Sequence, residues 1–222
     1  MSSINILLKK IEKMVTFHSN DELTALGEIS STSNSDPFKI LISTILSHRT
    51  RDANTSKASK NLFSVINSPQ DLNKIDLDLL VDLIKPAAFY NVKARSLKRV
   101  SSELITRFDG VVPNNIDDLL SLTSVGRKTA NCVLVYGFGL PAIPVDTHVH
   151  RISNRLNLVS TTDPDDTEVK LNDIIPKKYW MNINELFVRF GQTVCAPIKP
   201  NCKVCSLTNN CSFYQKIRKP EN

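Results

Sequence analysis

The stretch from Leu122 to Arg151 limits what this chain can fold into more than any other part of the sequence. It places Gly126 between two apolar segments, Lys128 two residues later, and the isolated Asp146 eighteen residues beyond that lysine. A glycine suits a tight turn between two helices because it can adopt backbone angles that other residues resist. The free N–H groups and the positive dipole end of the second helix could bind a phosphate without reading any sequence. We therefore predict a helical hairpin that faces an anionic partner.

Two basic residues, Arg127 and Lys128, stand in the first turn of the second predicted helix. The helix dipole opposes cations there, so acidic residues would be the ordinary choice. In a functional interpretation, Arg127 meets a phosphate, and Lys128, as a neutral amine, forms a Schiff base with a sugar carbon at the aldehyde oxidation level. In the alternative interpretation, both are solvated side chains at the start of a helix.

Asp146 also has two interpretations. An aspartate before Thr147 is a good N-cap for the helix that carries Val149 and Ile152. In a functional role, its carboxylate would support a developing sugar cation or help to deprotonate an amine. The residues by themselves leave both roles open.

The composition favours a helical protein with an anionic partner. The chain has 222 residues, 41% of them hydrophobic, so it can bury a core in one large domain or two modest ones. Six glycines and the lack of long alternating runs favour about ten to twelve helices and no strand. A net charge of +6 makes nucleic acid the first candidate partner.

Local patterns fix several boundaries. Apolar residues at helical spacing predict a helix over residues 4–17. The polar segment 27–35 has the composition of a loop. After it, Asp36 and Pro37 fit the N-cap and first position of a nearly all-apolar helix, which we expect at the centre of a core.

The cysteines indicate a metal site. The sequence has no window of about 18 consecutive apolar residues and no signal-peptide pattern, so we expect an intracellular protein of the cytoplasm or nucleoid, away from membranes. Disulfides are unusual there. Four of the five cysteines lie between Cys195 and Cys211, and four thiolates can hold either zinc or a [4Fe–4S] cluster. The fifth, Cys132, is expected to be a core residue.

The hairpin carries a resemblance to a known family. The sequences LTSVGRKTA at 122–130 and VDTH at 145–148 resemble the helix-hairpin-helix and Gly/Pro-Asp signature of the endonuclease III family of DNA glycosylases, including the spacing from lysine to aspartate. The resemblance implies that Lys128 is the nucleophile and Asp146 the catalytic carboxylate. The family turn usually reads LPGVG, whereas this chain has Thr123-Ser124 in place of Pro-Gly. We therefore expect either strained backbone angles at Ser124 or a slightly different turn.

The cysteine spacing resembles the iron–sulfur loop of the same family. Six, two and five residues separate the successive cysteines. The resemblance implies a [4Fe–4S] cluster held by Cys195, Cys202, Cys205 and Cys211. Lys199 lies within this loop and is a candidate contact to the DNA backbone, with simple solvation as the alternative.

Two further segments resemble the loops that this family inserts into DNA. An enzyme that attacks C1′ must take the base out of the stack, and a side chain fills the space. In SHRTRD at 47–52 that residue would be Arg49, which could hydrogen-bond the opposite base, with a bias towards guanine. In PAAFYNVKA at 86–94 the apolar wedge would be Phe89, with Lys93 as a candidate DNA contact. A surface arginine and a core phenylalanine are the alternatives.

Together these features predict an all-α protein with two lobes. Residues 30–140 would form a six-helix lobe with the hairpin, and residues 1–29 and 141–222 the lobe with the [4Fe–4S] loop. The resemblance implies a monomeric, bifunctional DNA N-glycosylase and AP lyase of base excision repair, acting on double-stranded DNA that contains damaged bases or abasic sites. It would remove oxidised or hydrated pyrimidines through a Schiff base on Lys128 and β-elimination. The residues expected to contact DNA are Arg49, Phe89, Lys93, Gly126, Arg127 and Lys199.

Two other functions remain open. A mismatch-type thymine, uracil or adenine glycosylase of the same superfamily usually lacks a lysine at this position, so Lys128 argues against it, whereas Arg49 argues for an altered base preference. A non-catalytic, cluster-bearing DNA-binding module would bind DNA without releasing a base.

Overall fold

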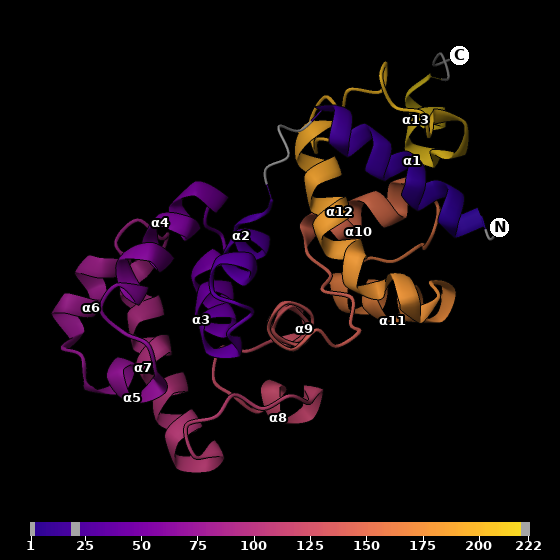
Figure 1. Cartoon of the computed structure of the whole chain (residues 1–222). Coiled ribbons are helices and arrows are strands. Elements are labelled where there is room, and N and C mark those ends of the chain that lie inside the picture. Colours follow the sequence, from indigo (N-terminus) through magenta and orange to yellow (C-terminus); the bar gives the residue numbers. More distant parts are fainter. Residues whose placement is uncertain (1–2, 19–22, 219–222) are drawn as a thin grey trace. The chain divides into compact units, whose positions relative to one another are not determined.

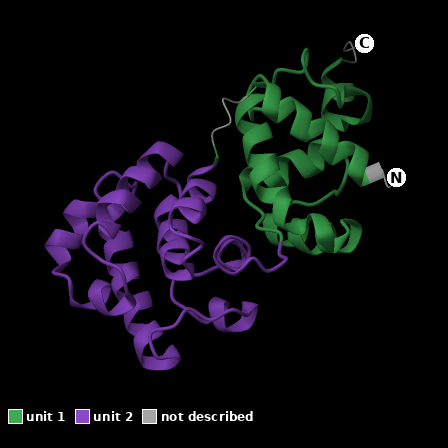
Figure 2. Cartoon of the chain, viewed as in Figure 1, with its two compact units in different colours: residues 1–23, 143–222 green, residues 24–142 purple. Residues whose placement is uncertain are grey.

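A computed structural model describes residues 3–18 and 23–218 of the chain, and every regular element in these ranges is a helix. The chain divides into two compact units, one formed by Met1–Leu23 with Ile143–Asn222 and the other by Thr24–Ala142 (Figure 2). The all-α prediction is therefore confirmed. The unit that contains the hairpin begins at Thr24 and ends at Ala142, whereas the sequence predicts its ends at residues 30 and 140.

The unit formed by Thr24–Ala142 is organised around α3 (Pro37–Ser47). This helix packs against α2 (Ala25–Thr32), α4 (Asp52–Phe63), α7 (Tyr90–Phe108), α9 (Arg127–Cys132) and the π-helical η1 (Val133–Gly137). Its predicted start is confirmed, since Asp36 Oδ1 accepts hydrogen bonds from Phe38 N at 2.9 Å and Lys39 N at 3.4 Å. Eight of its residues are buried, so it forms the centre of this unit's core, as its all-round apolar sequence predicts. The other elements of this unit are α5 (Pro69–Lys74), α6 (Leu77–Ile84) and α8 (Ile116–Leu120) (Figure 1).

Helix α2 corrects the expectation of a loop at residues 27–35. Thr24 caps it by accepting a hydrogen bond from Gly27 N at 3.2 Å. Ala25, Leu26 and Ile29 are buried, and the helix packs against α3, α4 and η1. Burial of this short apolar face outweighs the low helix propensity of the glycine, serine and threonine residues within the same helix.

The other unit is built on α12 (Trp180–Thr193), which packs against α1 (Ser3–His18) and α10 (Thr147–Arg155) (Figure 1). The helix predicted over residues 4–17 is confirmed as α1. Phe187 and Phe190 of α12 are among the largest fully buried side chains and form the middle of this core. The remaining elements are α11 (Pro164–Ile174), η2 (Lys177–Tyr179), η3 (Thr208–Asn210) and α13 (Ser212–Arg218).

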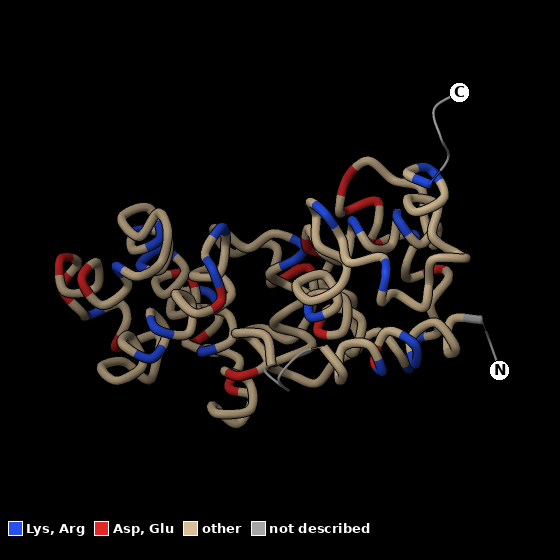
Figure 3. Tube along the Cα trace, turned by 90° about the horizontal axis from the view of Figure 1, so that it is seen from above, with Lys and Arg blue, Asp and Glu red and all other residues tan. Residues whose placement is uncertain are grey.

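Charged residues occur over both units. Lysine and arginine are interspersed with aspartate and glutamate along the chain, with no single helix holding all the basic residues (Figure 3). Among the described helices, none is long and apolar enough to cross a membrane. The net charge therefore gives no location for an anionic partner, and the candidate site has to be found from individual residues.

Candidate functional site

The helical hairpin joins α8 to α9 through residues 121–126. Its left-handed residue is Ser124, with φ of 63°, whereas Gly126 has φ of −96° and ψ of 178°, which is extended backbone. The expectation that Gly126 supplies the unusual backbone angles is therefore wrong, and the expected strain at Ser124 is confirmed. Gly126 is the N-cap of α9 and, as a glycine, makes no side-chain capping hydrogen bond. A Cβ at Gly126 would meet no atom within 4 Å.

Lys128 lies in the first turn of α9, next to a partly buried polar pair. It is half-buried, as is Arg127. The following residue, Thr129, is buried, and its Oγ1 lies 3.0 Å from His48 Nε2. The pKa of His48 is lowered to about 4, first by burial and then by the positive charges of Lys128 and Lys93. The imidazole beside Lys128 is therefore neutral near pH 7. No sequence pattern indicates a role for His48, because its partner, Thr129, lies in the hairpin, far along the chain.

The first loop, residues 48–51, connects α3 to α4 and exposes Arg49. A hydrogen bond of 3.0 Å from Thr50 N to Ser47 O closes its turn. His48 has φ of −56° and ψ of 116°, and Arg49 has φ of 55°. These angles correspond to a type II turn, whose third residue is ordinarily glycine. Arg49 thus occupies a strained backbone position and its side chain is exposed.

The second loop, residues 85–89, connects α6 to α7 and ends on Phe89. Phe89 is the N-cap of α7, with φ of 57° and ψ of 32°, and 60% of its surface is exposed. The alternative of a core phenylalanine is therefore wrong. A large apolar side chain at the tip of a loop, on a backbone that non-glycine residues avoid, is a feature that needs a functional reason.

Lys93, in the first turns of α7, does not face solvent. Only 6% of its surface is exposed, and its Nζ donates hydrogen bonds to Leu46 O at 2.6 Å, His48 O at 2.8 Å and Thr50 Oγ1 at 2.8 Å. Burial lowers its pKa to about 8. The expectation that Lys93 contacts DNA is wrong, because its three donors are occupied inside the unit.

Asp146 is the N-cap of α10, as one of its two interpretations required. Its Oδ1 accepts hydrogen bonds from His148 N at 2.9 Å and Val149 N at 2.8 Å, and the side chain is half-buried. Among the described residues, no hydrogen bond is made to its other oxygen, Oδ2. Capping therefore fixes the carboxylate's orientation and leaves one oxygen open for another role.

The far end of α10 holds the cysteine segment. Arg151 Nη2 donates to Cys195 O at 2.9 Å and Gly191 O at 3.3 Å. Arg155 donates to Cys195 Sγ at 3.4 Å, Ala196 O at 2.7 Å and Pro197 O at 2.9 Å. One helix thus connects the carboxylate of Asp146 to the backbone that carries the first cysteine.

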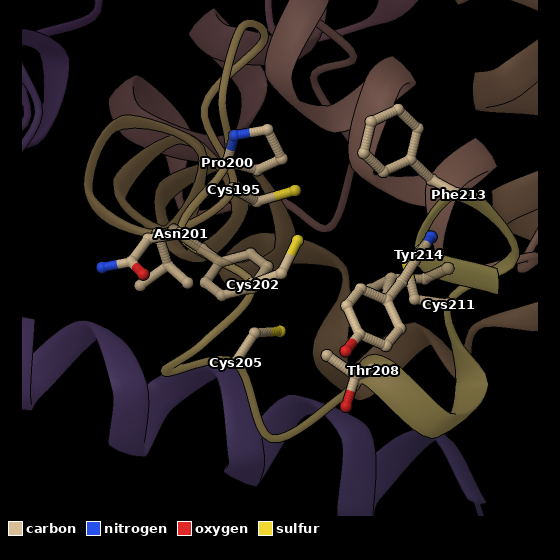
Figure 4. A pocket seen from close by; sticks show the side chains of 12 residues that line it. Cys195, Pro200, Asn201, Cys202, Cys205, Thr208, Cys211, Phe213 and Tyr214 are labelled. Carbon is tan, nitrogen blue, oxygen red and sulfur yellow. Dashed lines mark hydrogen bonds between the residues drawn. The ribbon is translucent and has the colours of Figure 1, made fainter. Parts of the chain in front are cut away.

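The four clustered cysteines line one hollow, together with apolar and aromatic side chains. Figure 4 shows the sulfurs of Cys195, Cys202 and Cys205 turned toward the same space, with Cys211 on the opposite side beside Tyr214. Burial and the neighbouring cysteines raise the pKa of the Cys202 and Cys205 thiols. In the described parts of the chain, no three His, Cys, Asp or Glu side chains are grouped so that they could hold one metal ion.

Two residues of the prediction remain to be placed, Lys199 and Cys132. Lys199 is exposed in the cysteine segment and has φ of 54°. Cys132 is fully buried in α9, as expected, and belongs to the core.

Comparisons with known proteins give this geometry a context. Residues 42–177 match the HhH-GPD superfamily of base excision DNA repair proteins, and this range includes Lys128 and Asp146. The chain is 50% identical to Endonuclease III of Thermotoga maritima, over 84% of this chain and 87% of that relative. The structure of a trapped endonuclease III–DNA covalent intermediate aligns with a TM-score of 0.83 at 31% identity, over 99% of this chain and all of the other. The structure of a thermostable thymine-DNA glycosylase aligns with a TM-score of 0.81 at 25% identity, over 96% of each chain.

Proposed function

Because this chain belongs to the endonuclease III family of the HhH-GPD superfamily, we propose that Lys128 and Asp146 carry out its chemistry on double-stranded DNA containing a damaged pyrimidine or an abasic site. The enzyme is a bifunctional DNA glycosylase with AP lyase activity in base excision repair. The observation that carries the residue assignment is the lysine at the first turn of the hairpin's second helix, within the part of the chain that matches the family.

The proposed reaction begins with the amine of Lys128. The amine attacks C1′, the bond from C1′ to the base breaks, and the base leaves with a proton. Loss of the amine proton and opening of the sugar ring then give a Schiff base between Nζ and C1′. Removal of a proton from C2′ breaks the bond from C3′ to its oxygen, and the 3′ phosphate leaves. Water then releases the lysine.

Asp146 would stabilise positive charge at C1′ as the base departs. Its two hydrogen bonds to α10 support this role, because they hold the carboxylate in one orientation without using Oδ2. The N-cap interpretation and the catalytic one are therefore compatible.

The loops would hold the duplex open. Arg49 and Phe89 are both exposed on left-handed backbone, which supports their insertion into the space that the flipped nucleotide leaves. Gly126, Arg127 and Lys199 would contact the DNA backbone.

We further propose that Cys195, Cys202, Cys205 and Cys211 hold a [4Fe–4S] cluster. Four thiols around one hollow suit it, and a cofactor larger than one ion can reach sulfurs that are not grouped for a single metal. When bound, the cluster would cross-link the cysteine segment through iron–thiolate bonds. Arg151 and Arg155 would then fix that segment to the helix that Asp146 caps.

Borohydride trapping tests this mechanism. With duplex DNA carrying one abasic site, wild-type protein is expected to give a covalent adduct and Lys128→Ala none. Lys170→Ala, in α11, is the matched control and is expected to give the wild-type amount. No adduct with the wild type, or an undiminished adduct with Lys128→Ala, would refute the lyase mechanism.

A mismatch-type glycosylase is the second candidate, because Arg49 argues for an altered base preference and the chain also resembles a thymine-DNA glycosylase structure. A panel of duplexes, each with one lesion or one G:T or G:U mismatch, separates the two. Faster release from the mismatches than from oxidised or hydrated pyrimidines would favour this second function.

A further inference from the structure

We infer that Lys93 is a positioning residue that fastens the first loop to the second, so that Arg49 and Phe89 enter DNA as one unit. The inference rests on the proposed function, because it assumes that the two side chains insert. It assigns Lys93 a role that does not require it to touch DNA.

The ammonium of Lys93 is completely satisfied by the end of α3 and the first loop. Its three donors match three acceptors: Leu46 O in the last turn of α3, then His48 O and Thr50 Oγ1. The last carbonyls of a helix lack intrahelical partners and carry partial negative charge, so a cation is favourable there. Among the described residues, Lys93 makes no ion pair, so carbonyl and hydroxyl oxygens alone hold this charge.

The same lysine also fixes the second loop. Its backbone N–H donates to Phe89 O at 3.0 Å, which sets the start of α7. Thr50 Oγ1, which accepts from Lys93 Nζ, also accepts from Ala88 N at 3.1 Å. The side chain of Lys93 therefore holds the first loop, its backbone holds the second, and the Thr50 hydroxyl bonds directly between them.

Both loops need such support because each contains a strained residue. Arg49 and Phe89 have φ of 55° and 57°, a region that side chains with a Cβ disfavour. Their exposed side chains make little packing contact to enforce it. A loop released from Lys93 or Thr50 would relax to other conformations, and its inserting side chain would lose its position relative to the other.

The experiment compares two lysines that make similar bonds on the same helix. Lys98 of α7 also donates to backbone carbonyls, those of Asn73 and Ile75, but it lies away from both loops. The rate of strand cleavage is measured on a duplex with one abasic site and on the same abasic strand alone, and the first rate is divided by the second. The single strand has no opposite base, so it does not require the two loops to separate a base pair. Lys93→Met is expected to lower this ratio by about tenfold or more, since charge-assisted hydrogen bonds are lost, while Lys98→Met leaves it unchanged.

Two variants of Thr50 test the same inference if Lys93→Met fails to fold. Thr50→Val removes the bridging hydroxyl and is expected to lower the ratio by about threefold, whereas Thr50→Ser keeps it and should behave as wild type. Lys93→Arg retains the charge, so its ratio of duplex to single-strand activity is expected to lie between those of Lys93→Met and the wild type.

A readout without chemistry separates this inference from the proposed function. The fluorescence of 2-aminopurine opposite a tetrahydrofuran abasic analogue reports unstacking on binding. At saturating protein, Lys93→Met and Thr50→Val should each give a smaller increase than the wild type. If the wild type gives no covalent adduct with borohydride, the proposed lyase mechanism is refuted. The fluorescence measurement still tests the role of Lys93 in that case, because it involves no chemistry. Equal losses on duplex and single strand with unchanged fluorescence, or equal ratios for Lys93→Met and Lys98→Met, would overturn the inference.

Discussion

The carboxylate of Glu103 accepts both hydrogen bonds that Thr123 donates. Thr123 N lies 2.7 Å from Glu103 Oε2, and the threonine hydroxyl bonds to Oε1. The next residue, Ser124, donates to Ser96 Oγ at 3.0 Å. Glu103 and Ser96 both lie on α7, so two bonded pairs tie the hairpin turn to this helix. This chain therefore holds by hydrogen bonds a turn that the family usually builds from proline and glycine.

Glu103→Ala is expected to weaken duplex binding by about tenfold and to lower the free energy of unfolding by about 1 to 2 kcal/mol, because Thr123 loses both acceptors. Single-turnover trapping at saturating DNA should change little, since Lys128 is untouched. Titration of DNA by fluorescence anisotropy measures the first effect and urea unfolding the second.

The family turn supplies the control for this prediction. In a background with Thr123→Pro and Ser124→Gly, the turn no longer needs Glu103, so Glu103→Ala should cost much less affinity. Additive effects of the two changes would contradict a role for Glu103 in holding this turn.

Asp146 offers a way to separate its two roles. Asn is as good an N-cap as Asp, so Asp146→Asn should keep the stability of the wild type, whereas Asp146→Ala should lose about 1 kcal/mol. Both variants remove the carboxylate charge and are expected to slow base release by about a hundredfold or more. Single-turnover excision and thermal unfolding measure the two properties. Wild-type excision rates in Asp146→Asn would leave the residue as an N-cap alone.

The residues that the sequence located correctly are those set by local patterns. The start of α3 follows from an Asp–Pro pair before an apolar run, and α1 follows from apolar spacing. Ser124 was expected to be strained because it replaces a glycine within a recognisable turn. Such features depend on neighbours a few residues away, which the sequence displays directly.

Features set by distant contacts were missed. Lysine is ordinarily exposed, and Lys93 is buried because its acceptors come from the end of α3, on another part of the chain. Helix α2 was missed because its stability comes from packing on α3 and α4, which outweighs the residues typical of loops. His48 meets Thr129 only after the hairpin packs against α3. None of these pairings leaves a local signal.

The partly buried imidazole of His48 makes stability depend on pH. Its pKa is lowered to about 4 in the folded chain from a usual value of 6.5, first by burial and then by Lys128 and Lys93. The unfolded chain therefore takes up a proton as the pH falls through 6.5, while the folded chain does not until about pH 4. Stability is lost over this interval, by at most about 3 kcal/mol. The free energy of unfolding, measured with urea at several pH values between 4 and 6.5, should change less with pH in His48→Gln than in the wild type. An equal change with pH in both proteins would refute His48 as the cause.

The last prediction concerns the cysteine segment. Cys202→Ser removes one of four thiols from the hollow and is expected to abolish visible absorption and reduce iron from about four atoms per chain to near zero. The thermal midpoint should fall as well, because the segment bonded to Arg155 loses its cross-link. Cys132→Ala is the matched control, since Cys132 is buried in the core of the other unit. It should lower stability through its cavity and keep the iron. Iron analysis, the visible spectrum and thermal unfolding measure these effects, and a colourless wild type containing zinc would overturn the cluster assignment.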